Sequence, residues 1–89
     1  MIDKLVNRYF TKVLLNELIL ALQIKTAYKY EFTYQFEKNC AILLCNRKNN
    51  GHYITIYKVK YEEALCNYCH NFEKQLKHIL QAVRIYYEE

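Results

Sequence analysis

The sequence contains no proline, no tryptophan and no serine, and its 89 residues include a single glycine and a single aspartate. With no proline and one glycine, no stretch has the composition of a flexible linker or a low-complexity tail. The absence of serine excludes a serine nucleophile, and one glycine cannot make a glycine-rich phosphate loop. Because a typical domain has about 100–150 residues, we expect a single domain over residues 1–89. Its small core favours a partner chain that helps to bury apolar surface.

Lysine, asparagine, isoleucine and tyrosine are abundant instead, a skew that is typical of AT-rich genomes such as those of many phages and mobile elements. The formal net charge is +4, and residues 28–60 hold the excess of positive charge. A basic region of this kind steers acidic proteins or the phosphate backbone of nucleic acids toward it. The charge therefore indicates an acidic partner of one of these two classes.

The N-terminal region has basic residues before an apolar run over residues 13–22, which is the order found in export signals. Asn16 and Glu17 interrupt this run, and it is too short to span a membrane. We therefore expect no membrane segment and a cytoplasmic location, in the host cytoplasm if the protein is viral. In that reducing compartment the four cysteines are expected to be free thiols.

Hydrophobic periodicity predicts an α+β fold with the order α-β-β-β-α, in which two helices pack on a three-stranded antiparallel sheet. Apolar residues recur at helical spacing over 3–26 and over 62–87, whereas 28–37 alternates aromatic and polar residues as a strand does. Residues 40–45 are apolar on both faces, which suits a central strand, and the third strand covers 52–60. These five elements account for almost the whole chain.

Both predicted helices are more apolar than a surface helix needs to be. In the first, Leu15, Ile19 and Leu20 widen the apolar face, so this helix is expected to be largely buried or to be covered by a partner. The second carries a seven-residue seam, made of Leu65, Cys69, Phe72, Leu76, Ile79, Val83 and Tyr86. The seam favours packing within the chain, and pairing with a second chain is the alternative.

The turns predict which residues of the sheet face the helices. A two-residue turn at Asn50-Gly51 and a three-residue loop over residues 37–39 together predict that Ile42 and Leu44 face the core. The opposite face would then expose three apolar side chains, those of Leu43, Ile54 and Ile56. We predict that these three form a homodimer or partner interface.

One motif, Cys66-Asn67-Tyr68-Cys69-His70, matches the attachment sequence of c-type haem. Because haem attachment requires export and Cys69 belongs to the helix seam, packing of the thiol in the core is the favoured interpretation. Cys66, Cys69 and His70 are also the nearest approach to a metal-ligand set, and Cys66 with His70 to a nucleophile pair, but no orienting carboxylate accompanies them. We therefore expect no catalytic residues, no metal and no cofactor.

The best candidate for binding is the tip of the second hairpin, where cations, amides and an aromatic side chain come together. The residues concerned are Arg47, Lys48, Asn49, His52 and Tyr53, continued along the strand by Lys58 and Lys60. Such a β-ribbon can follow a phosphate backbone or meet an acidic protein surface, with Tyr53 available for stacking. The alternative is that turns are polar in most proteins and that lysines keep a sheet edge soluble.

These observations favour a small non-catalytic interaction protein, of the kind with which phages or mobile elements inhibit or regulate a host protein. Small size, the lack of a catalytic set and the abundance of tyrosine, a favoured interface residue, support a protein partner. A homodimer is expected as well. The alternative is a small nucleic-acid-binding protein that uses the basic hairpin tip.

Overall fold

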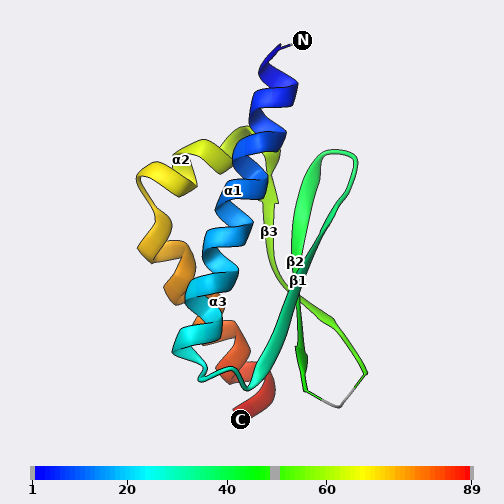
Figure 1. Cartoon of the computed structure of the whole chain (residues 1–89), viewed down its shortest axis with the longest axis vertical. Helices are drawn as coiled ribbons and strands as arrows, with labels where there is room; N and C mark the ends of the chain where they lie inside the picture. Colours follow the sequence, from blue (N-terminus) through cyan, green and yellow to red (C-terminus); the bar gives the residue numbers. More distant parts are fainter. Residues whose placement is uncertain (1, 49–50, 89) are drawn as a thin grey trace.

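The chain folds as helices packed on one antiparallel sheet (Figure 1). The computed structural model describes the backbone of residues 2–48 and 51–88 and the side chains of residues 4–48 and 51–87. The elements in chain order are α1 (Ile2–Lys25), β1 (Tyr30–Phe36), β2 (Cys40–Arg47), β3 (Ile54–Lys60), the 3-10 helix η1 (Tyr61–Glu63), α2 (Ala64–Cys69) and α3 (Phe72–Glu88). The strand order is β1-β2-β3, with both pairs antiparallel. The predicted α+β fold and its α-β-β-β-α order are confirmed.

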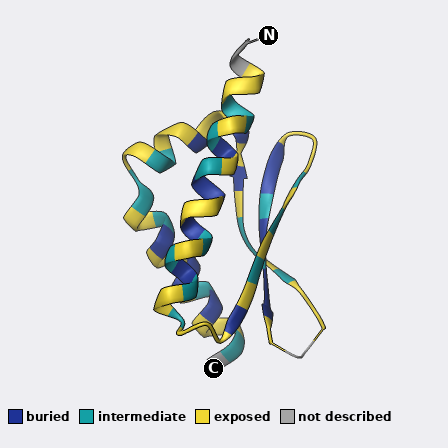
Figure 2. Ribbon diagram, viewed as in Figure 1, coloured by how far each residue is buried: buried dark blue, intermediate teal, exposed yellow. Residues whose placement is uncertain are grey.

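The core lies between the helices and one face of the sheet, where the ribbon segments coloured as buried in Figure 2 face one another. Helix α1 contributes leucines that recur every three or four residues, which is the spacing of one helix face. Helix α3 presents a matching face, and all three strands of the sheet complete the core. Its buried residues are Leu14, Leu15, Leu18 and Leu22 of α1, Leu76, Ile79, Leu80 and Val83 of α3, Tyr30, Ala41, Leu43, Cys45 and Val59 of the sheet, and Tyr61 and Ala64 at the start of η1 and α2.

The predicted second helix over 62–87 is interrupted, so its continuity was a wrong prediction. Helix α2 ends at Cys69, and α3 begins at Phe72. Asn71 lies immediately before α3, at the position where asparagine is favoured as a helix cap. The interruption also divides the predicted seam. Its members in the middle of α3 are buried in the chain's own core, whereas Leu65 and Tyr86 are exposed.

The first hairpin has a tighter turn than predicted. As a result, the side chains of β2 that were predicted to face the core face away from it, and their neighbours face the core instead. The backbone N–H of Glu37 donates to the carbonyl oxygen of Cys40 at 2.8 Å, which leaves only two residues at the tip. The strands consequently pair Tyr34 with Leu43. Because neighbours on a strand point to opposite faces, a shift of one residue moves a whole set of side chains across the sheet. The prediction that Ile42 and Leu44 face the core is therefore wrong.

The second hairpin contains a β-bulge that sequence reasoning did not predict. Leu43 pairs with Tyr57 and Leu44 pairs with Thr55, so Ile56 is an extra residue in β3. The bulge lets both Ile54 and Ile56 pack against the core, where they are half-buried. Leu43 is fully buried. The basis of the predicted interface, an outward-facing set of these three residues, is therefore wrong.

The predicted turn of this hairpin lies partly outside the described residues, because Asn50 is not among them. Gly51 is described, and it has a φ of +82°. This left-handed conformation is open to glycine without strain, which explains why the only glycine of the chain stands at this turn.

Candidate functional site

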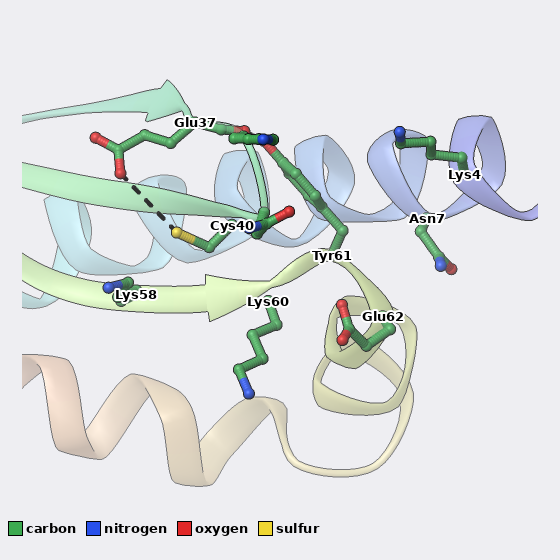
Figure 3. Close-up of a pocket in the computed structure, with 10 residues that line it drawn as sticks. Lys4, Asn7, Glu37, Cys40, Lys58, Lys60, Tyr61 and Glu62 are labelled. Carbon is green, nitrogen blue, oxygen red and sulfur yellow. Dashed lines mark hydrogen bonds between the residues drawn. The ribbon is translucent and has the colours of Figure 1, made fainter.

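A pocket of about 660 Å³ lies between the start of α1, the turn of the first hairpin and the junction of β3 with η1 (Figure 3). We call it the lysine pocket. Four lysines, two glutamates and two asparagines contribute most of its polar groups. Its lining residues are Lys4, Asn7, Glu37, Lys38, Asn39, Cys40, Lys58, Lys60, Tyr61 and Glu62. Segments far apart in the sequence thus form one site.

Strand pairing explains why two of these lysines share the pocket with Cys40. Cys40 pairs with Lys60 and Ile42 pairs with Lys58, so both lysines project from the sheet face that carries Cys40. This is the face opposite the helices. The two-residue turn then brings Lys38 to the same end of the sheet. The pocket is therefore a direct consequence of the two hairpin registers.

Tyr61 joins the three parts of the pocket. Its ring is almost buried, and the guanidinium carbon of Arg8 in α1 lies 4.7 Å from the ring centroid. Its hydroxyl donates a hydrogen bond to the carbonyl oxygen of Glu37 in the first hairpin turn. A cation over an aromatic face and a buried phenol with an acceptor are both stabilising contacts. Tyr61 therefore holds α1 and the hairpin turn against the start of η1.

The lysine pocket is electrostatically mixed, with an excess of positive charge. No salt bridge to Lys4, Lys38, Lys58 or Lys60 is present within the described residues. The Cys40 thiol lies 4.0 Å from the Glu37 carboxylate, at the outer limit for a hydrogen bond to sulfur (Figure 3). Ammonium groups without an internal partner are available to carboxylates of another molecule.

The structure divides the binding site that the sequence predicted. Lys58 and Lys60 line the lysine pocket, whereas Arg47 ends β2, and Lys48, His52 and Tyr53 lie between β2 and β3 at the other end of the sheet. Because a strand rises about 3.3 Å per residue, the two ends of β3 are roughly 20 Å apart. The lysines and the hairpin tip therefore do not form one contiguous patch.

Arg47 makes contacts inside the chain. Its guanidinium donates to the carbonyl oxygen of Tyr87 at 3.2 Å and lies 5.4 Å from the centroid of that ring. The hydroxyl of Tyr87 in turn donates to the carbonyl oxygen of Cys45 at 3.3 Å. Carbonyl groups in the last turn of a helix lack intrahelical partners, so a cation is favoured there. Arg47 therefore fastens the end of α3 to the sheet.

We expect Arg47→Ala to lower the free energy of unfolding by about 1 kcal/mol, because it removes one hydrogen bond and one cation–aromatic contact. Urea denaturation followed by circular dichroism measures the change. Lys48→Ala is the matched control, because Lys48 is exposed and has no such contact among the described residues. Equal stability of the two variants would show that the contact with Tyr87 contributes nothing.

The other tip residues are exposed where the structure describes them. Lys48 and His52 are exposed, and Tyr53 donates from its hydroxyl to the Glu31 carboxylate at 3.4 Å. Asn49 lies outside the described residues. The tip thus keeps two exposed basic or titratable side chains, while Tyr53 leans toward β1.

The cysteine motif lies on α2, away from the lysine pocket. Cys66 and Cys69 are exposed, so the expected packing of Cys69 in a helix seam is wrong. His70 follows α2, and its backbone N–H donates to the carbonyl oxygen of Cys66 at 2.8 Å. In the described part of the chain, no three histidine, cysteine, aspartate or glutamate side chains are grouped so that they could hold a metal ion.

Sequence reasoning missed most of the lysine pocket. Lys4 and Asn7 are three residues apart, as neighbours on one helix face are, but nothing local shows that this face meets the sheet. Glu37 and Lys38 looked like ordinary turn residues. Only the pairing of the strands brings them together with Lys58 and Lys60.

Comparisons with protein-family models, with curated proteins and with solved structures find no match to this chain. Among residues 2–48 and 51–88, no helix is both long enough and apolar enough to pass through a bilayer.

Proposed function

We propose that this is a small non-catalytic interaction protein that inhibits or regulates a partner protein by binding an acidic part of its surface. The lysine pocket carries this proposal. It offers four ammonium groups around a concave site, none of which forms a salt bridge with another described residue, and their charge complements carboxylates. The basic, lysine-rich composition and its AT-rich skew agree with an inhibitor or regulator from a phage or mobile element.

The mixed charge of the pocket favours a protein over a nucleic acid. Glu37 and Glu62 stand among the lysines, and they would repel a continuous phosphate backbone. None of the described residues that line the pocket is an arginine, the residue that binds phosphate in bidentate fashion. A protein segment can place its own carboxylates against the lysines and hydrogen-bond donors against the glutamates.

The experiment is an NMR titration of the labelled protein with a short oligoglutamate peptide and, separately, with an oligothymidylate of equal charge. We expect the peptide to shift the signals of the lysine pocket. The double variant Lys58→Glu/Lys60→Glu should weaken peptide binding by about tenfold or more. The matched control is Lys74→Glu/Lys77→Glu, which makes the same change of charge on the exposed side of α3.

Three outcomes decide between the hypotheses. Equal weakening in both double variants would mean that only net charge matters, and it would refute a site at the pocket. Binding of the oligonucleotide alone, with shifts at Lys48, His52 and Tyr53, would support the alternative of a nucleic-acid-binding hairpin tip. Peptide binding lost only in the pocket variant would support the proposal.

A further inference from the structure

Helix α1 carries apolar side chains on the side that faces away from the core. Leu20 is 56% exposed and Ile24 is 67% exposed, although both lie in the middle or second half of a helix that packs on the sheet. We call this surface the outer stripe. Its exposed residues are Leu5, Val6, Tyr9, Leu20 and Ile24, and the half-buried Val13 lies between them. Apolar side chains gathered on one exposed helix face are typical of an interaction surface.

The outer stripe has a seven-residue repeat. Val6, Val13 and Leu20 are seven residues apart, and the residues that follow each of them after three positions are Tyr9, Asn16 and Gln23. These are the spacings of the two inner positions of a coiled coil. At 1.5 Å per residue, the stripe runs for about 27 Å from Val6 to Ile24. Because α1 is already ordered by its own core, pairing would not have to order a helix first.

The charges beside the outer stripe favour a second copy of this chain as the partner, with the two α1 helices parallel. Lys12 precedes Val13 and Glu17 follows Asn16, so the two exposed charges flank the stripe on opposite sides. They are five residues apart, which is the spacing of the ion pairs that join two parallel helices across a coiled-coil seam. In an antiparallel pair, the side of α1 that carries Lys12 would face the same side of the second copy, so that lysine would lie opposite lysine. A parallel pair forms two Lys12–Glu17 contacts by symmetry.

We propose that the protein forms a parallel homodimer through the outer stripe of α1. Val6, Val13 and Leu20 meet the same residues of the second copy around a two-fold axis, and Lys12 meets Glu17 of the partner subunit on each side. Lys4 and Asn7, which line the lysine pocket, lie on the opposite side of α1. Dimerisation therefore leaves both pockets open, and it does not depend on the proposed function.

The first test is the mass of the protein in solution, by light scattering and sedimentation at micromolar concentration. We expect the wild-type chain to be a dimer and Leu20→Glu to raise the dissociation constant by about a hundredfold or more, because it places two carboxylates in the seam. Leu65→Glu, at an exposed leucine of α2, should leave the dimer unchanged. A monomeric wild-type chain, or a dimer that tolerates Leu20→Glu, would overturn the proposal.

Circular dichroism checks that the variants are folded, and Ile24→Glu replaces Leu20→Glu if the latter unfolds. Exchanging the charges of Lys12 and Glu17 gives a further test, because unfolding of a variant could not restore the dimer in the double exchange. Lys12→Glu and Glu17→Lys should each weaken the dimer by about tenfold, and the double exchange should restore it to within a few-fold. A double exchange that is as weak as the single variants would overturn the ion pairs and with them the assigned partner contacts.

The direction of the helices is tested by disulfide formation from Val6→Cys, in a chain whose exposed Cys66 and Cys69 are replaced by alanine. In the parallel dimer the two introduced thiols lie beside each other, within the roughly 6 Å between α-carbons that a disulfide requires. In an antiparallel pair centred on the stripe they are about 25 Å apart. Oxidation should therefore give a covalent dimer, and its absence would exclude the parallel arrangement.

Discussion

Leu43→Ala is expected to lower the free energy of unfolding by about 3 kcal/mol, whereas Leu44→Ala should lower it by about 1 kcal/mol or less. Leu43 lies on the central strand and is fully buried between the sheet and the helices. Truncating it removes apolar contacts and leaves a cavity in the core. Leu44 is its neighbour on the opposite face, where it is half-buried, so less apolar area is lost.

Chemical denaturation of both variants at one protein concentration measures this difference, and the equal concentration matters because dimerisation adds to apparent stability. The pair is closely matched, since the same side chain is shortened at adjacent positions. The opposite order of stabilities would support the register predicted from the sequence, in which Leu44 faces the core. Equal losses would mean that both faces of β2 are buried to the same extent.

Alkaline pH is expected to destabilise the protein, beginning near pH 9. Burial raises the pKa of the Cys45 thiol to about 11 from its ordinary 9.0, and a hydrogen bond with Tyr87 opposes this rise. Burial likewise raises the pKa of Tyr57 to about 12 from 10.0, opposed by a hydrogen bond from Asn67 and assisted by the charge of Glu63. Both groups are therefore held neutral in the folded chain at pH values where they ionise in the unfolded chain.

The difference in pKa between the folded and unfolded chains determines how the free energy of unfolding changes with pH. A group whose pKa is raised in the folded state contributes its full stability below the unfolded pKa and loses it as the pH rises toward the folded pKa. For Cys45 the loss falls between about pH 9 and 11 and amounts to roughly 2–3 kcal/mol. Tyr57 adds a further loss between about pH 10 and 12.

Unfolding free energies measured from pH 7 to 11 test this prediction. Cys45→Ala should be less stable at pH 7, because the core loses a buried group, but its stability should fall less steeply above pH 9. Cys66→Ala is the control, since that thiol is exposed and its removal should leave the steep fall unchanged. If Cys45→Ala kept the full alkaline loss, the buried thiol would not be its source.

The order and type of the elements could be predicted because hydrophobic periodicity is a local property. Alternation over 28–37 marks a strand, and the structure places β1 at Tyr30–Phe36. Helical spacing over 3–26 similarly marks α1. The break between α2 and α3 was missed although Asn71 is a favoured capping residue, because a continuous seven-residue seam gave the stronger signal.

The candidate site was only partly predictable. Lys58 and Lys60 could be placed on one face from the sequence, since residues two apart on a strand share a face, and both are exposed. Their grouping with the hairpin tip is not what the structure shows, because they line the lysine pocket with Glu37 and the start of α1. The sequence predicts Arg47 as a binding residue of the tip but gives no sign of its contact with Tyr87, because that contact depends on where α3 ends.

The spacing of apolar residues along the chain was thus enough to establish the class of fold, because each helix or strand shows its period within its own sequence. Contacts between segments remote in sequence decided which strand faces are buried and which residues form the pocket. One residue of difference in a hairpin turn and one extra residue at Ile56 determined which side of β2 and β3 is buried. The same registers brought Lys38, Lys58 and Lys60 to one end of the sheet, where α1 adds Lys4. The outer stripe of α1 is exposed because it lies on the helix face opposite the buried leucines.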